Sequence, residues 1–308
     1  ISGLNAELPS GVTTFNVPTL TTLVDTFDSS IFNVNIVVSN NCTFAPNVYN
    51  NERNVYLTGD LSGIKNGYYL YRDANQWFGF PESLESAPYM YDVAGFNEIS
   101  EPIPNGLTNT VGMFNGCYNL TSIPSDIDLS NCTNASGMFS YCFNLTTIDS
   151  NFLKTAKPGI DISEMFNYCN NLVEITGVMD LSNCKYAYSM FEHCSNLTTV
   201  DFNFIKTLKP GAYIVEMFNN CPNLICNDIN VFTNIPLGVN AERWFGGKLV
   251  SDVNTNNEVI LNAINTINID GNVNISLGTN VASNFALGVT KSLNVDIDIT
   301  TAPSNSDY

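Results

Sequence analysis

His193 is the only histidine in the chain, so it is the first residue to consider for acid–base chemistry or metal binding. It lies between Phe191 and Cys194, which raises a Cys–His dyad or a metal ligand as interpretations. With one histidine in 308 residues, a Ser–His–Asp triad or a histidine-based metal site lacks its parts. We therefore expect His193 to fill a partly exposed position of a repeat.

The nine cysteines are the other candidates for reactivity or cross-linking. Five of them recur at one position of a repeat, where a thiol behaves as a small apolar side chain. Three spacings leave a disulfide open, namely Cys132–Cys142, Cys184–Cys194 and Cys221–Cys226. Because nine is odd, at least one thiol has no partner within the chain. We expect most thiols to be free and buried, as in a reducing compartment, whereas bridges would favour secretion.

Carboxylates are plentiful but scattered along the chain. Asp126 with Asp128, and Asp296 with Asp298, share a strand face, but no Asp-x-Asp-x-Asp-Gly calcium loop follows either pair. The sequence also contains no phosphate-binding glycine loop, nucleophile elbow or zinc-ligand spacing. It therefore predicts no catalytic residue, no metal site and no cofactor, and we expect a protein that is not an enzyme.

Four lysines stand out because they come from two copies of one turn. Lys154 and Lys157 belong to Lys-Thr-Ala-Lys-Pro-Gly, and Lys206 and Lys209 belong to Lys-Thr-Leu-Lys-Pro-Gly. In a stack of repeats, copies that recur after two units lie on the same edge. A basic stripe on an acidic protein is typical of a site for an acidic glycan, a protein partner or an acidic neighbour in an assembly. The alternative is a solvated turn whose lysines promote solubility.

Internal repetition dominates the middle of the chain. Met-Phe recurs five times, and the distances between successive copies alternate between a shorter and a longer one, so two units make a super-repeat. A cysteine follows each pair by three positions. The expected repeat core is Met113, Phe114, Cys117, Met138, Phe139, Cys142, Met165, Phe166, Cys169, Met190, Phe191, Cys194, Met217, Phe218 and Cys221. Weaker copies are expected at residues 23–27, 74–78, 87–91, 241–245 and 281–285.

Within one unit, the apolar residues predict a short helix followed by a short strand. Residues 135, 138, 139, 142 and 145 fall at i, i+3, i+4, i+7 and i+10, which is one stripe of a helix. Residues 145–148, Leu-Thr-Thr-Ile, are typical of a strand. A unit of about 25 residues cannot bury this stripe alone, so units must stack on their neighbours. We expect an α/β repeat fold: a leucine-rich-repeat-like solenoid with short helices, a parallel sheet and β-rich modified ends.

The texture of the sequence divides the chain into three regions. Residues 1–106 are expected to form an N-terminal β-rich cap with degenerate repeats, 107–250 the regular solenoid, and 251–308 a C-terminal β-rich cap and tail. Both flanks alternate apolar and polar residues with period two, at 32–38, 267–270, 273–275 and 293–299. Such strands would close the open ends of a stack or dock another chain.

The repeat itself resembles a known family. The recurring pattern Met-Phe-x-x-Cys-x-Asn-Leu-Thr-x-Ile resembles the BspA-like leucine-rich repeats of bacterial surface proteins, and its five strong copies cover residues 107–226. The resemblance implies a curved right-handed solenoid, surface display, and binding to host or partner macromolecules. The chain departs from the family in its abundance of asparagine, with 46 residues. Similar repeats also occur in viral and protist proteins.

Charge narrows the range of partners. The chain has 11 Lys and Arg against 29 Asp and Glu, a formal net charge of −18, which repels nucleic acid and anionic membranes. We therefore expect no nucleic-acid binding. No apolar run is long enough to span a bilayer, so we expect no membrane insertion either.

These observations favour a non-enzymatic interaction or adhesion protein displayed on an extracellular surface. It would bind a protein or glycan receptor, or neighbouring subunits, on a cell envelope or as a fibre, spike or decoration of a virus particle. Free thiols favour the virus particle, and the family resemblance favours the envelope. The alternative is a structural subunit that polymerises end to end into a filament. An enzyme on the same scaffold would need a cleft of clustered carboxylates, which the spacing does not show.

Overall fold

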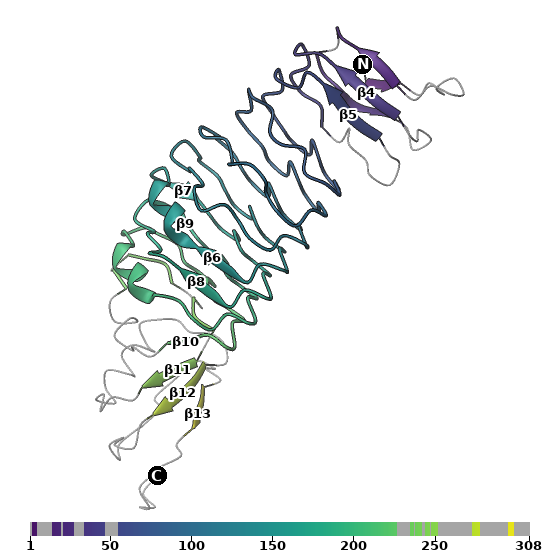
Figure 1. Cartoon of the computed structure of the whole chain (residues 1–308). Coiled ribbons are helices and arrows are strands. Elements are labelled where there is room, and N and C mark those ends of the chain that lie inside the picture. The colour runs from purple at the N-terminus through teal and green to yellow at the C-terminus, as the bar shows by residue number, and fades with distance from the viewer. Residues whose placement is uncertain are drawn as a thin grey trace, which may run out of the picture.

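The computed structural model describes residues 2–4, 14–19, 21–27, 34–46, 55–226, 235–236, 238–241, 244–246, 248–251, 273–277 and 295–298. In this part the chain winds into a row of stacked turns, with strands at both ends (Figure 1). Its regular elements are short strands and two 3₁₀ helices, and the described residues contain no α-helix.

All strand pairings in the described part are parallel. At the N-terminal end, β1 (Ser2–Leu4) pairs with β3 (Val24–Phe27), and a second sheet has the order β2 (Thr14–Val17), β4 (Val34–Val38), β5 (Val55–Gly59). In the middle, β6 (Thr147–Asp149) pairs with β8 (Glu174–Thr176), and β7 (Ile160–Asp161) with β9 (Cys184–Tyr186). The last sheet has the order β10 (Ile225–Cys226), β11 (Lys248–Ser251), β12 (Val273–Leu277), β13 (Val295–Asp298).

Single parallel bridges continue this pairing along the whole stack. They connect Thr22, Phe44, Asn66 and Ser86 in one series, and Asn109, Asn134, Asp161, Tyr186, Tyr213 and Asn240 in another. The Ala87 N–H donates to the Asn109 carbonyl at 2.9 Å and joins the two series. We call the chain between successive bridge residues a coil. The coils follow one another in register from Thr22 to Asn240, and the ladder crosses the expected domain boundary at residue 106 without a break.

The Met-Phe segments are not the short helices that their spacing predicts. In these segments every second N–H donates to the following coil, as Phe139 does to the Met165 carbonyl at 2.9 Å. The amides between them donate three residues back, as Ser140 does to the Gly137 carbonyl at 3.0 Å. Positive φ angles at Gly137 (60°) and Tyr141 (60°) recur at the same two places in the other coils and interrupt helical geometry. The inward stripe of residues is nevertheless the predicted one.

The core of the stack is a spine of aromatic rings. Phe114, Phe139, Phe166, Phe191 and Phe218 are each fully buried. Neighbouring rings lie 5.2–5.6 Å apart, with interplanar angles of 3–9°. All fifteen expected repeat-core residues have 0 % exposure, so burial of the Met-Phe-x-x-Cys positions is confirmed. Such offset parallel stacking adds to the hydrophobic gain of burial.

The cysteine of each repeat has a specific role beside this spine. Its thiol donates to the carbonyl of the aromatic residue one coil earlier, as Cys169 Sγ does to the Phe139 carbonyl at 3.3 Å. The same bond recurs at Cys117, Cys142, Cys194 and Cys221, with distances of 3.1–3.3 Å. A small side chain that is apolar in bulk and carries a weak donor suits this position.

The weaker copies fit the spine in part. Met90–Tyr91 continues it on one side and Trp244–Phe245 on the other, because the Phe218 N–H donates to the Trp244 carbonyl. At residues 74–78 the expectation is wrong: Tyr71 takes the aromatic position, and its ring lies 5.1 Å from the Tyr91 ring at a tilt of 33°. Residues 24–27 form strand β3, and residues 281–285 and 267–270 lie outside the described residues.

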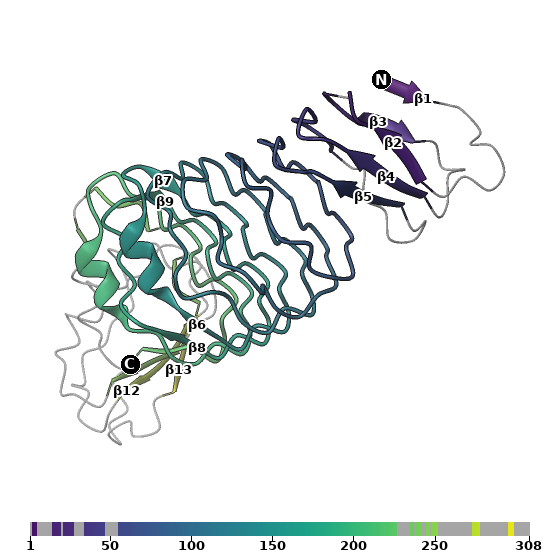
Figure 2. The ribbon, with the colours of Figure 1, turned by 45° about the horizontal axis from the view of Figure 1, so that its top comes forward.

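The two 3₁₀ helices lie next to each other on one side of the stack (Figure 2). They are η1 (Ser150–Thr155) and η2 (Phe202–Thr207), and each follows a capping aspartate, Asp149 or Asp201. Because they come from equivalent coils of the super-repeat, the intervening coil separates them. They position the lysines of the repeated turn.

Candidate functional site

The first lysine of each turn is held by its own 3₁₀ helix. Lys154 Nζ donates to Asn151 Oδ1 at 2.7 Å, and Lys206 Nζ donates to Asn203 Oδ1 at 2.8 Å. Asp149 and Asp201 accept the backbone N–H of these asparagines, so each cap also fixes the residue that orients the lysine. Both lysines are exposed.

The second lysine of each turn precedes Pro-Gly. Gly159 (φ 86°) and Gly211 (φ 88°) take the left-handed region that glycine tolerates best, which turns the chain sharply after Lys157 and Lys209. Both lysines are exposed. The structure thus places the four predicted lysines at two equivalent corners of the stack, as expected for copies two coils apart.

A fifth lysine, which the sequence reasoning missed, lies in the coil between these corners. Lys185 is in strand β9, and its Nζ lies over the ring of Tyr186, 4.9 Å from the centroid. Hydrogen bonding to Tyr186 raises the pKa of this fully exposed amine above its usual value. Its position midway between the two Lys-Pro-Gly turns was the available signal, but Lys185 belongs to no repeated motif, so repetition alone does not predict its place on this edge.

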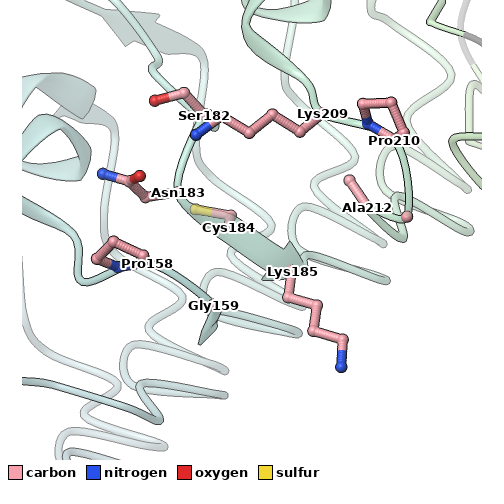
Figure 3. Close-up of a pocket in the computed structure, with 10 residues that line it drawn as sticks. Pro158, Gly159, Ser182, Asn183, Cys184, Lys185, Lys209, Pro210 and Ala212 are labelled. Atoms are coloured by element: carbon pink, nitrogen blue, oxygen red, sulfur yellow. The ribbon is translucent and has the colours of Figure 1, made fainter.

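A surface pocket joins Lys185 to the second turn. Its volume is about 320 Å³, and its lining includes Pro158–Gly159 on one side, Pro210–Gly211 on the other and residues 182–185 between them. Figure 3 shows the Lys209 side chain extending along this pocket, while Lys185 points away from the turns at its rim. We call Lys154, Lys157, Lys185, Lys206 and Lys209 the lysine edge.

The lysine edge concentrates the positive charge of the stack. These five are the only Lys or Arg residues between Asp73 and Glu242, a stretch that carries many carboxylates. Within the part of the chain that the structure describes, none of the five forms an ion pair, whereas Lys65 pairs with Glu85 and Arg72 with Asp92. The charge of the edge is therefore available to a partner.

His193 occupies a partly exposed position of the repeat, as we expected. It stacks on Tyr168 with 4.2 Å between centroids, and Tyr168 stacks on Tyr141 at 4.8 Å. Asn220 continues this row with a contact of 3.3 Å between its Nδ2 and His193 Nε2. Glu192 Oε1 lies 3.7 Å from the same nitrogen. The described residues hold no group of three His, Cys, Asp or Glu side chains arranged to bind a metal ion.

The cysteines are free and buried throughout. All nine thiols are unbridged, so none of the three open pairings forms. Burial raises the pKa of Cys169, Cys184 and Cys221 to about 12, which keeps these thiols protonated at neutral pH. Since the thiolate is the nucleophile, these side chains are packing groups.

Part of the chain matches a model of a known protein family. Residues 86–204 match a family model described as "Mycoplasma protein of unknown function, DUF285", which covers the coils of Met90 to Met190. No curated protein and no solved structure matches the chain. Among the helices of the described residues, none has the length and apolar character needed to span a bilayer.

Proposed function

We propose that this protein is a non-enzymatic interaction or adhesion protein, built as a leucine-rich-repeat-like solenoid and displayed on an extracellular surface of a cell envelope or virus particle. The family that matches residues 86–204 is associated with BspA-like surface repeat proteins, which supports a relationship of this chain to BspA-like repeats. The in-register parallel coils and the buried aromatic spine support the solenoid architecture.

The observation that carries the proposal is the lysine edge. On a chain of net charge −18, unpaired lysines gather at two repeated corners and the coil between them. If lysine served solubility alone, nothing would require the basic residues of the stack to share one edge. A concentrated patch of one sign, on a body of the other, attracts a complementary partner and orients it.

Binding is tested with the full chain on an array of extracellular-matrix proteins and glycans. The variant Lys154→Gln/Lys157→Gln/Lys206→Gln/Lys209→Gln removes the four predicted partner-binding charges, and Lys65→Gln is the control outside the edge. We expect saturable binding to at least one class of macromolecule, weakened at least about fivefold in the fourfold variant and within about twofold in the control. Equal binding by wild type and fourfold variant, or no binding at all, contradicts the proposal.

Display is tested separately on intact source cells or particles. An antibody against the chain should label them without permeabilisation, and external protease should remove the label. Labelling that requires permeabilisation would contradict surface display while leaving the binding result unaffected.

A filament subunit is the second candidate, because both ends of the stack carry parallel sheets. In the described residues β13 pairs only with β12, which leaves its other edge without a strand. A subunit that joins end to end through such edges forms a polymer whose mass grows with concentration. Sedimentation over a hundredfold concentration range distinguishes the two: an adhesin keeps a constant small mass.

A further inference from the structure

Two coils depart from the repeat where the lysine edge lies. At the bridge position, Asn109, Asn134 and Asp161 each use a side-chain oxygen to accept the N–H two residues ahead, at 2.9–3.0 Å. Tyr186 and Tyr213 occupy the same position in the next two coils and have no oxygen within reach of that N–H. The stack thus loses a stabilising turn bond in these coils.

In place of that bond, these two coils carry a pair of neighbouring tyrosine rings. The rings of Tyr186 and Tyr213 lie 5.3 Å apart with an angle of 35°, and Tyr213 is 40 % exposed. Each follows a pocket-lining residue, Lys185 or Ala212. An exposed phenol in place of a structural asparagine indicates a binding role for this side chain.

The pocket also offers polar groups of the kind that bind hydroxyls. Asn183 donates through Nδ2 to the Ala156 carbonyl at 2.9 Å, but its Oδ1 has no hydrogen bond within the described part of the chain. The Ser182 hydroxyl likewise has no hydrogen bond within the described residues. Only the backbone N–H of Ser182 is bonded, and it donates to Asp180 Oδ1. Both residues line the pocket together with Lys209 (Figure 3).

We propose that this pocket binds an acidic polysaccharide, with the anionic groups on Lys185 and Lys209 and sugar hydroxyls on Ser182 and Asn183. The apolar face of a further sugar ring would lie on Tyr213, the exposed residue that follows the pocket-lining Ala212. This inference rests on the proposed function and names its partner class. Carboxylate and sulfate groups can both pair with these lysines, so the test below compares a carboxylated sugar with a sulfated one.

The repeat geometry suits a linear polymer. Successive spine rings over the two coils between the turns lie 5.6 Å and 5.5 Å apart, so equivalent lysines recur after two such steps, a distance comparable with the length of one disaccharide. A polymer with anionic groups at such intervals can contact Lys157 and Lys209 in turn. Nucleic acid is a poorer candidate partner for the lysine edge, because the edge contains no arginine. Arginine is the residue that most often forms bidentate hydrogen bonds to bases and phosphates.

The test measures dissociation constants of the full chain for size-matched oligosaccharides: a heparin fragment (sulfated), a hyaluronan fragment (carboxylated) and dextran (neutral), with single-stranded DNA of similar charge as the competing polyanion. We expect binding to at least one acidic sugar, weakening as salt rises from about 50 to about 300 mM, and none to dextran. Lys185→Gln and Lys209→Gln should each weaken binding about fivefold. Tyr213→Asn, which restores the residue of other coils, should weaken it about threefold.

Matched controls are Lys65→Gln for charge and Tyr118→Asn for an exposed tyrosine, 45 % exposed, outside the edge. Both should stay within about twofold of wild type. Equal loss in controls and edge variants overturns the site, and DNA binding as tight as that of the sugars overturns the partner class. If no acidic sugar binds while the chain still captures a protein through the four lysines, this inference fails and the proposed function stands.

Discussion

At the scale of single residues, the spine depends on aromatic rings that stack on their counterparts in adjacent coils. Phe166 lies at the centre, 5.6 Å from Phe139 and 5.5 Å from Phe191, and is fully buried. Each ring therefore connects one coil to the next, in addition to the backbone hydrogen bonds between the coils. Removing one ring tests whether the coils are stable only through their neighbours.

We expect Phe166→Ala to lower the free energy of unfolding by about 3–5 kcal/mol, because it removes the buried ring and leaves a cavity between two others. The measurement is urea unfolding followed by circular dichroism. Val178→Ala, at a position 50 % exposed, is the control and should change stability by less than about 0.5 kcal/mol. A loss below about 1 kcal/mol for Phe166→Ala would show that the spine is not the main source of stability.

The buried thiols predict that the folded chain loses stability as the pH rises above 9, and that a chain lacking one of these thiols loses less. Burial raises the pKa of Cys169 from 9.0 to about 12, so above pH 9 the unfolded chain releases this proton while the folded chain retains it. Unfolding then becomes more favourable by up to about 1.4 kcal/mol per pH unit for each such thiol, until the pH passes the folded pKa. Between pH 9 and 10.5 the stability of Cys169→Ala should fall less steeply than that of wild type. Tyrosine ionisation affects both chains alike, so parallel curves would contradict the assignment.

At the scale of elements, the conformation of the Met-Phe segments determines what each position tolerates. Gly112 and Gly137 occupy the same place in consecutive coils, with φ of 55° and 60°. A methyl group at Gly112 would overlap the Tyr89 ring, whereas at Gly137 the nearest atom, Ser140 Cβ, lies 3.9 Å away. Alanine substitutions at these two positions therefore distinguish the cost of backbone strain, which both would have, from the cost of steric overlap, which only Gly112→Ala would have.

We expect Gly137→Ala to cost about 1–2 kcal/mol, the strain of a left-handed residue with a side chain. Gly112→Ala should cost about 1–3 kcal/mol more, because the Tyr89 ring must also move. Thermal or urea unfolding of both variants measures the difference. Adding Tyr89→Ala should rescue Gly112→Ala in part and leave the Gly137→Ala loss unchanged. Equal losses for the two alanines would argue against the overlap.

The sequence was informative about this element in some respects only. The Met-Phe-x-x-Cys spacing predicts which side chains face inward, and all of them do. It does not distinguish a helix from the observed segment, because both place residues 138, 139 and 142 on one side. The deciding feature is positive φ at residues such as Glu164 and Tyr168, and residue type does not reveal it, since non-glycine residues rarely adopt it. The inter-coil hydrogen bonds, which exist only in the stack, compensate that strain.

The candidate site was likewise predictable in part. The duplicated Lys-x-x-Lys-Pro-Gly turns revealed four lysines and their common edge, because repetition in sequence becomes alignment in the stack. Lys185 and Tyr213 belong to no duplicated motif, and their relation to the turns appears only when neighbouring coils lie side by side. Residues that differ from their equivalents in the other coils were therefore the signal that would have pointed to Lys185 and Tyr213.

At the scale of the whole molecule, stability is a sum over coils and their contacts, so the ends should open before the middle. The nine free thiols report this opening because each becomes reactive only when its coil is exposed. Cys42 lies in an early coil and Cys226 in β10, while Cys142, Cys169 and Cys194 lie in the centre.

We expect no thiol to react rapidly with a water-soluble alkylating reagent in the native protein, and all nine to react after denaturation without a reductant. At intermediate urea, peptide mapping should show Cys42 and Cys226 modified before the three central cysteines, because opening that begins at either end of the stack reaches their coils first. Phe166→Ala is the internal comparison, because a cavity at the centre should make Cys169 react earlier relative to Cys42. Simultaneous modification of all nine thiols would mean that the stack unfolds as one cooperative unit, and fewer than nine after denaturation would reveal a disulfide.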